Sequence, residues 1–353
     1  MFKILNKKVK GVEWFIPIIY GMVICIYPFP ETFDIARFFK FYDIFSNNPF
    51  LSDIQINILI NSPDIIAKLV LLFLAELGLP IEIFLFFSAY ITGVLFLLVF
   101  KEIYISYNKI YPSIGGYLLI YFLLSVAGIL SGIRNIQAWA FVMLAMVFLE
   151  SRNEVKIKSY IYLLYGGLVH YAAYAFLPIF YFRNRLNNIS INQILKIGSI
   201  ISIVLLIGVL NIEHTFFNRF GNAWYHKFDF YFYKSEFLIS SFRKGYLSFL
   251  YKFSYTYLPF IIGVYLLVNA PLKFQSHLIL KTGMFLGLIF LFFPDIMNRY
   301  TLFLKIGTLF YVISSRLYRE SIIAKIYLYV IVIFALLEQY FFWKQVLFYN
   351  TSL

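Results

Sequence analysis

A succession of long apolar runs constrains this chain more than any other feature. The runs lie at 14–29, 83–100, 114–131, 136–150, 194–212, 246–268, 278–293, 300–315 and 322–341. A helix needs about 20 such residues to cross a bilayer. The composition agrees, because 62% of the residues are hydrophobic and 13% are charged, about half the charge of a soluble domain. The sequence predicts an all-α, polytopic membrane protein with about 10–12 transmembrane or re-entrant helices.

Two further apolar stretches are interrupted. The stretch 159–182 contains Gly166, Gly167, His170 and Pro178. Two short half-helices that meet near Gly166–His170 are predicted there, with a single crossing as the alternative. The stretch 64–79 ends in Gly78-Leu79-Pro80 and is expected to be re-entrant or to lie at the outer surface.

Basic residues indicate how the chain is oriented, because cytoplasmic loops are enriched in Lys and Arg. The segments predicted to be cytoplasmic carry 17 of the 30 basic residues and lie at 1–13, 101–112, 151–158, 183–196, 270–281 and 316–325. The first apolar run is predicted to be an uncleaved helix whose N-terminus lies inside. Residues 1–353 are expected to form one polytopic membrane domain, with periplasmic loops near 30–62 and 213–245.

The other thirteen basic residues fall on the predicted outer side. This excess indicates an anionic partner, such as a membrane lipid or a lipid-linked phosphate, and nucleic acid is excluded as a partner. Cys25 is the only cysteine, which excludes a disulfide scaffold. The four histidines are scattered and no P-loop or dinucleotide fingerprint is present, so neither a metal nor a cofactor is expected.

Arg134 is the first candidate site residue. It follows Gly132 between two apolar runs and, with Asn135 and Gln137, forms a polar cluster. An arginine at membrane depth is costly unless it is paired or hydrated, which indicates function. A snorkelling anchor at the interface is the structural alternative.

His170 is the second candidate and is followed by Tyr171. The preceding glycines free backbone groups that the membrane tolerates only beside a cavity or protein. A neutral imidazole there accepts a hydroxyl proton, and an imidazolium supports a phosphate. A buried histidine with a purely structural role is the alternative.

Polar side chains in the predicted outer segments complete the candidate set. Arg299 can take phosphate oxygens in a bidentate fashion, or can form an i, i+4 ion pair with Asp295. Asp34, near Arg37, is the best carboxylate for activating a hydroxyl, or is a solvated loop acid. The segment 213–245 either stacks on sugars and holds phosphate or is an amphipathic interfacial helix; its candidate binding residues are Arg219, His226 and Lys227.

The order of these motifs resembles the EpsG family of bacterial exopolysaccharide and O-antigen polymerases of the Wzy type. The run from Gly132 to Ala138 matches a Gly-x-Arg-Gln-like element, and His170 follows Arg134 after 36 residues, as a histidine does in that family. Three further segments also fit the pattern of that family: the first outer loop, the Asp64–Tyr90 pair of helices, and Asp295 to Tyr300. Asn135 and Tyr171 depart from the Gln and the small residue that often follow the arginine and histidine.

The resemblance implies a GT-C-like glycosyltransferase in the bacterial inner membrane, with its active site facing the periplasm. It would transfer a growing glycan from undecaprenyl pyrophosphate to the terminal sugar of a second undecaprenyl-pyrophosphate-linked repeat unit. Arg134 and Arg299 would neutralise the leaving pyrophosphate, and His170 would deprotonate the acceptor hydroxyl, with Asp34 as the alternative base. A chain-length regulator protein is a further candidate partner.

Three other functions compete with this interpretation. An O-antigen ligase uses the same donor, although the outer loops here are short for one. A lipid-linked oligosaccharide transporter commonly shows internal repeats, which this sequence lacks. A membrane O-acyltransferase also fits an intramembrane histidine, but the first helix lacks the Arg/His pattern of that class.

Overall fold

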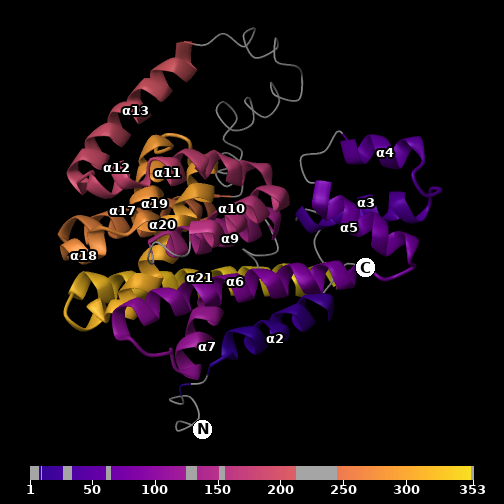
Figure 1. Cartoon of the computed structure of the whole chain (residues 1–353), viewed down its shortest axis with the longest axis horizontal. Coiled ribbons are helices and arrows are strands. Elements are labelled where there is room, and N and C mark those ends of the chain that lie inside the picture. The colour runs from indigo at the N-terminus through magenta and orange to yellow at the C-terminus, as the bar shows by residue number, and fades with distance from the viewer. Residues whose placement is uncertain are drawn as a thin grey trace. The chain divides into compact units, whose positions relative to one another are not determined.

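The computed structural model describes residues 8, 10–26, 34–60, 65–124, 133–150, 156–211 and 245–350. These residues are mostly helical, and the one β-type pairing among them is an isolated bridge between Lys8 and Ser113. The predicted all-α class is therefore confirmed. The chain divides into unit 1, Met1–Tyr181 with Ile331–Leu353, and unit 2, Phe182–Val330. Figure 1 shows the helices of both units.

The helices of unit 1 are α2 (Val12–Ile26), α3 (Asp34–Ser46), α4 (Asp53–Ile60), α5 (Ile65–Glu76), α6 (Glu82–Asn108), α7 (Ile114–Leu123), α9 (Ile133–Glu150), α10 (Lys156–Val169), the 3-10 helix η2 (Tyr171–Phe176) and α11 (Leu177–Tyr181). Those of unit 2 are α12 (Arg183–Asn188), α13 (Ile191–Asn211), α17 (Tyr246–Asn269), α18 (Leu272–Gln275), α19 (Leu278–Ile289), α20 (Pro294–Ser315) and η4 (Leu317–Arg319). Helix α21 (Ile322–Asn350) contributes to both units.

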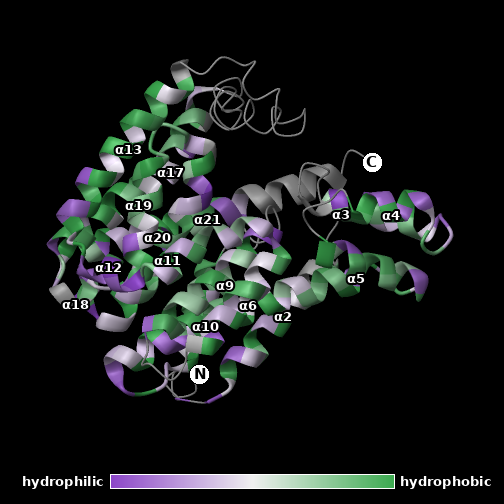
Figure 2. Cartoon of the chain, turned by 45° about the horizontal axis from the view of Figure 1, so that its top comes forward, coloured by the Kyte–Doolittle hydropathy of each residue, from purple (hydrophilic) through white to green (hydrophobic). Residues whose placement is uncertain are grey.

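A helix overlaps every apolar run that the sequence predicts to cross the membrane, over the part of each run that the structure describes. Four of the described helices, α6, α13, α17 and α21, are long and apolar enough to span a bilayer. Figure 2 shows this apolar character along α13, in contrast to the hydrophilic α12 beside it in sequence. The coarse prediction of a helical membrane protein is thus supported.

Helix α6 is the centre of unit 1, because α2, α7 and α9 all pack on it. Gly93 makes the approach of two of them possible. A Cβ at Gly93 would lie 2.9 Å from Cβ of Pro17 in α2 and 3.0 Å from Cε2 of Tyr121 in α7. The missing side chain therefore sets how closely α2 and α7 pack against α6.

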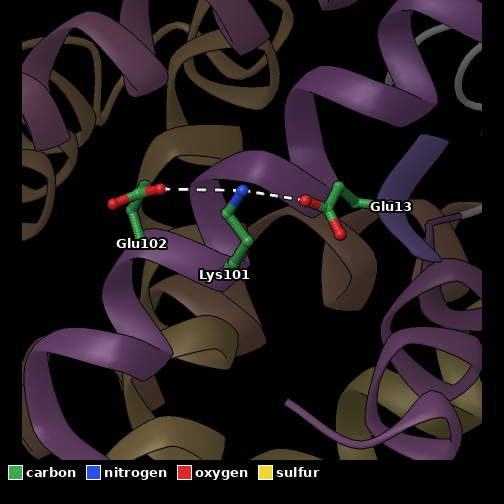
Figure 3. A network of polar contacts seen from close by, with 3 residues as sticks. All are labelled: Glu13, Lys101 and Glu102. Atoms are coloured by element: carbon green, nitrogen blue, oxygen red, sulfur yellow. Dashed lines mark hydrogen bonds and ion pairs between the residues drawn. The ribbon is translucent and has the colours of Figure 1, made fainter. Parts of the chain in front are cut away.

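A charged contact is buried where α2 meets α6. The Lys101 ammonium lies 2.8 Å from a Glu13 carboxylate oxygen and 3.9 Å from one of Glu102, as Figure 3 shows. Glu13 is only 2% exposed. The lysine compensates a carboxylate that would otherwise be unpaired in the protein interior.

Helices α3, α4 and α5 form a separate group against the first turns of α6. Its core includes Phe38 and Phe45 of α3, Leu71 of α5 and Phe84 of α6. The predicted outer loop 30–62 is therefore largely helical, because apolar side chains recur along α3 at helical spacing. Gln55 fixes the turn between α3 and α4 by donating to the carbonyls of Phe45 and Asn48.

The core of unit 2 is the pair α19 and α20, which are in close contact at Gly283. A Cβ there would lie 2.5 Å from the backbone nitrogen of Leu304. At the start of α19, the Lys281 ammonium is 5% exposed and donates to the carbonyls of Leu186, Asn187 and Ile189 at 2.9–3.0 Å. The lysine thereby donates to carbonyls at the C-terminal end of α12, where the helix leaves carbonyls without a partner within the helix.

The segments predicted to be cytoplasmic gather at one end of each unit. In unit 1 the Lys8–Ser113 bridge joins segment 1–13 to the residue that follows segment 101–112, and Glu102 lies within electrostatic range of Lys158. In unit 2 Lys281 joins 183–196 to 270–281. The His277 ring stacks on Tyr311 with the ring centroids 3.9 Å apart, one turn before segment 316–325. Each unit therefore has one end that combines its predicted cytoplasmic segments.

Candidate functional site

Arg134 lies in the first turn of α9 and is half-buried. Its guanidinium carbon is 5.4 Å from the centroid of the Phe38 ring in α3, and Phe38 is 2% exposed. A guanidinium at this distance from an aromatic ring makes a cation–π interaction. The contact brings the start of α9 to α3, in the first segment predicted to be outside.

Helix α3 carries two more of the predicted site residues. It begins at Asp34, which is four residues before Phe38 and therefore on the same helical face. Only the backbone position of Asp34 is described. Arg37 is exposed on the same turn. The fold thus brings Asp34, Arg37 and Arg134 into one neighbourhood.

His170 lies where α10 ends. Its backbone is extended, with φ −150° and ψ 117°, and the 3-10 helix η2 begins at the next residue. The imidazole is half-buried and its centroid is 5.0 Å from that of Tyr171, in an edge-to-face arrangement. The predicted helix break near Gly166–His170 is confirmed, with His170 at the break.

The chain turns back on itself at this break. A Cβ at Gly166 would lie 3.5 Å from Cβ of Ala173, although residues seven apart in a straight helix are about 10.5 Å apart along its axis. Gly167 likewise faces the ring of Tyr174 so closely that a Cβ would overlap it. The two glycines make room for η2 to fold against α10.

Helices α9 and α10 pack antiparallel, and side-chain contacts fix their register. Phe148 stacks on Tyr162 at 5.5 Å between centroids, and Phe141 lies 6.1 Å from Tyr165. Nearer the break, a Cβ at Gly166 would lie 3.2 Å from the Ala138 carbonyl oxygen.

His170 lies one helical turn after Gly166, and Arg134 lies one turn before Ala138. The same register therefore brings His170 to the first turn of α9, where Arg134 lies. Gln137 is in the second turn of α9 and is half-buried. Arg134, Gln137, His170 and Tyr171 therefore share one end of the helix pair. The predicted cytoplasmic loop, 151–158, joins the two helices at the other end.

Arg299 lies in unit 2 and is outside this group. It is exposed in the second turn of α20, which starts with Pro294 at a position that favours proline. The next residue, Tyr300, stacks on Phe290 with centroids 5.3 Å apart. Asp295 has no described side chain, so the expected Asp295–Arg299 ion pair remains a prediction. Arg219, His226 and Lys227 lie in 212–244, outside the described residues.

Lys68 is the residue of this neighbourhood that the sequence interpretation missed. It lies in α5, and its ammonium is 3.8 Å from the centroid of the Phe41 ring and 3.3 Å from the Ile58 carbonyl oxygen. It is 6% exposed. The signal in the sequence was a lone lysine within the apolar stretch 64–79, where a charge is costly without a partner.

The site combines fixed cations with a titratable imidazole. Arginine presents a planar fork to phosphate oxygens, and histidine exchanges a proton near neutral pH. Among the described residues, no group of three or more His, Cys, Asp or Glu side chains is placed to hold a metal ion. Comparisons with protein-family models, curated proteins and solved structures found no match to the chain.

Proposed function

We propose that this chain is a GT-C-like membrane glycosyltransferase that polymerises a polysaccharide at the periplasmic face of the bacterial inner membrane. The donor is a glycan on undecaprenyl pyrophosphate, and the acceptor is the terminal sugar of another undecaprenyl-pyrophosphate-linked repeat unit. One observation carries the proposal: the register of α9 and α10 brings Arg134 and His170 to the same end of the pair.

The distribution of charge along unit 1 supports the proposed orientation. The predicted cytoplasmic segments meet around the Glu13–Lys101 contact and the Lys8–Ser113 bridge. Arg134 and His170 lie at the end of α9 and α10 that is remote from their connecting loop. A lipid-linked donor on the side of the membrane opposite to the predicted cytoplasmic segments would meet the end that carries Arg134 and His170.

The proposed reaction assigns one task to each residue. The acceptor hydroxyl oxygen forms a bond to the anomeric carbon of the donor as the bond from that carbon to the pyrophosphate oxygen breaks. His170 takes the hydroxyl proton. Undecaprenyl pyrophosphate leaves as an anion, and Arg134 stabilises the charge that develops on it.

The experiment compares surface polysaccharide from a deletion strain complemented with wild-type, Arg134→Lys or His170→Ala protein, at equal membrane levels. We expect the wild type to restore the size ladder. The two variants should leave single repeat units attached to their lipid. Arg185→Lys is the matched control, because Arg185 is an exposed arginine whose guanidinium carbon is 5.8 Å from the Phe182 ring.

Three other outcomes would contradict the proposal. Full ladders from Arg134→Lys and His170→Ala would show that the residue roles are wrong. Long polymer that stays on the undecaprenyl carrier in the deletion strain would identify a ligase. A normal ladder with altered sugar decoration would identify an acyltransferase.

A further inference from the structure

Two cations from different helices lie on neighbouring aromatic rings of α3. The guanidinium carbon of Arg134, from α9, is 5.4 Å from the centroid of Phe38. The ammonium of Lys68, from α5, is 3.8 Å from the centroid of Phe41. Phe38 and Phe41 are three residues apart, so they are neighbours along one helical face with Cβ atoms about 5–6 Å apart.

The described surroundings of Lys68 supply no negative charge. Its ammonium donates to the Ile58 carbonyl and lies over the Phe41 ring. An ammonium has three N–H donors, so this single hydrogen bond leaves capacity for a ligand. Burying a cation is costly unless an anion or several hydrogen bonds compensate it. A cation–π contact offsets only part of that cost.

The Phe41 ring holds the Lys68 ammonium in place without neutralising it. A carboxylate partner would cancel the charge, whereas a phenyl face leaves it available to an anion. The surrounding core of Phe38, Phe45, Leu71 and Phe84 lowers the local dielectric constant, which strengthens attraction to an anionic group. The arrangement is suited to a ligand with two adjacent negative groups.

We propose that Lys68 is a second phosphate-binding cation, which together with Arg134 holds the pyrophosphate of a lipid-linked donor. This inference rests on the proposed function and adds a residue to its binding site.

The test measures binding to purified protein in nanodiscs of neutral phosphatidylcholine. The probes are undecaprenyl pyrophosphate, undecaprenyl monophosphate and undecaprenol. We expect the wild type to bind the pyrophosphate more tightly than the monophosphate. Lys68→Met should weaken pyrophosphate binding about tenfold or more, as expected when a charged hydrogen bond is lost, and should leave undecaprenol binding unchanged.

Two further variants separate the charge of Lys68 from its structural role. Lys68→Gln can still donate to the Ile58 carbonyl but lacks the charge, so it should also lose affinity for the pyrophosphate. Lys40→Met is the matched control, because Lys40 is an exposed lysine of α3, and it should bind like the wild type. Thermal unfolding of each variant reports whether the fold is intact.

Several results would overturn this inference. One is an unchanged affinity of folded Lys68→Met for undecaprenyl pyrophosphate. Another is that the wild-type protein binds the pyrophosphate and the monophosphate with equal affinity, a result that requires no variant. A Lys68 dependence seen only with phosphatidylglycerol vesicles would assign the site to ordinary anionic lipid and would also overturn it. Competition by inorganic pyrophosphate would support it and show that the headgroup is what binds.

Failure of the inference and failure of the proposed function look different in cells. A complete ladder from Lys68→Met would overturn the role of Lys68, while the loss of the ladder on deletion would still support polymerisation. An unchanged ladder on deletion of the gene would overturn both proposals.

Discussion

The Lys101 ammonium in α6 lies 2.8 Å from the carboxylate of Glu13 in α2, and Glu13 is 2% exposed. The contact joins two helices through residues that are 88 positions apart in sequence. It lies at the end of unit 1 that combines the predicted cytoplasmic segments. It is therefore a structural contact, separate from the candidate site.

Lys101→Met should destabilise the protein, because it leaves a buried carboxylate without its partner. The loss should be smaller than the roughly 3–5 kcal/mol of a fully buried pair, since the Lys101 side chain is 16% exposed. Thermal unfolding in detergent measures the effect. The double variant Glu13→Gln/Lys101→Met should recover part of the loss, and equal stability of the single and double variants would contradict the pairing.

Gly167→Ala should disturb the turn at His170, because an added Cβ overlaps the Tyr174 ring. We expect weaker thermal stability and shorter polymer, since η2 must move away from α10. Gly208→Ala is the control, because nothing lies within 4 Å of a Cβ there; it should be neutral or slightly stabilising. Normal ladders from Gly167→Ala would show that the tight turn is not needed.

Lys281→Met should destabilise unit 2, because it removes the donor to three carbonyls at the end of α12. Hydrogen bonds to charged groups each contribute about 1.5–3 kcal/mol. We expect increased hydrogen exchange at 186–189. Lys196→Met changes an exposed lysine of α13 and should leave exchange unchanged. Equal exchange in the two variants would refute the capping role.

Arg299→Lys should reduce polymer synthesis on the order of tenfold or more if the fork of the guanidinium holds phosphate. The measurement is the rate of polymer formation from purified lipid-linked repeat units. Arg319→Lys is the comparison, because Arg319 is an exposed arginine in a segment predicted to be cytoplasmic. A similar, small effect of both substitutions would show that Arg299 takes no part in the reaction.

The sequence alone located the apolar helices and the break at His170. Hydrophobic length needs no tertiary information, because a bilayer selects long apolar helices directly. Gly166 and Gly167 likewise marked the position where the backbone could turn. The helical character of α3 and α4 was missed, because polar residues such as Lys40 and Asp43 obscured the apolar face of Phe38 and Phe45.

Only the tertiary structure decided which charges meet which partners. Nothing in the sequence pairs Glu13 with Lys101, or Lys68 with the Phe41 ring, because such contacts depend on how helices pack over long separations in sequence. The register of α9 against α10, which groups Arg134 with His170, is set by Gly166 against Ala138 and by the Phe148–Tyr162 stack. Local pattern determined where helices form, and side-chain packing determined the site.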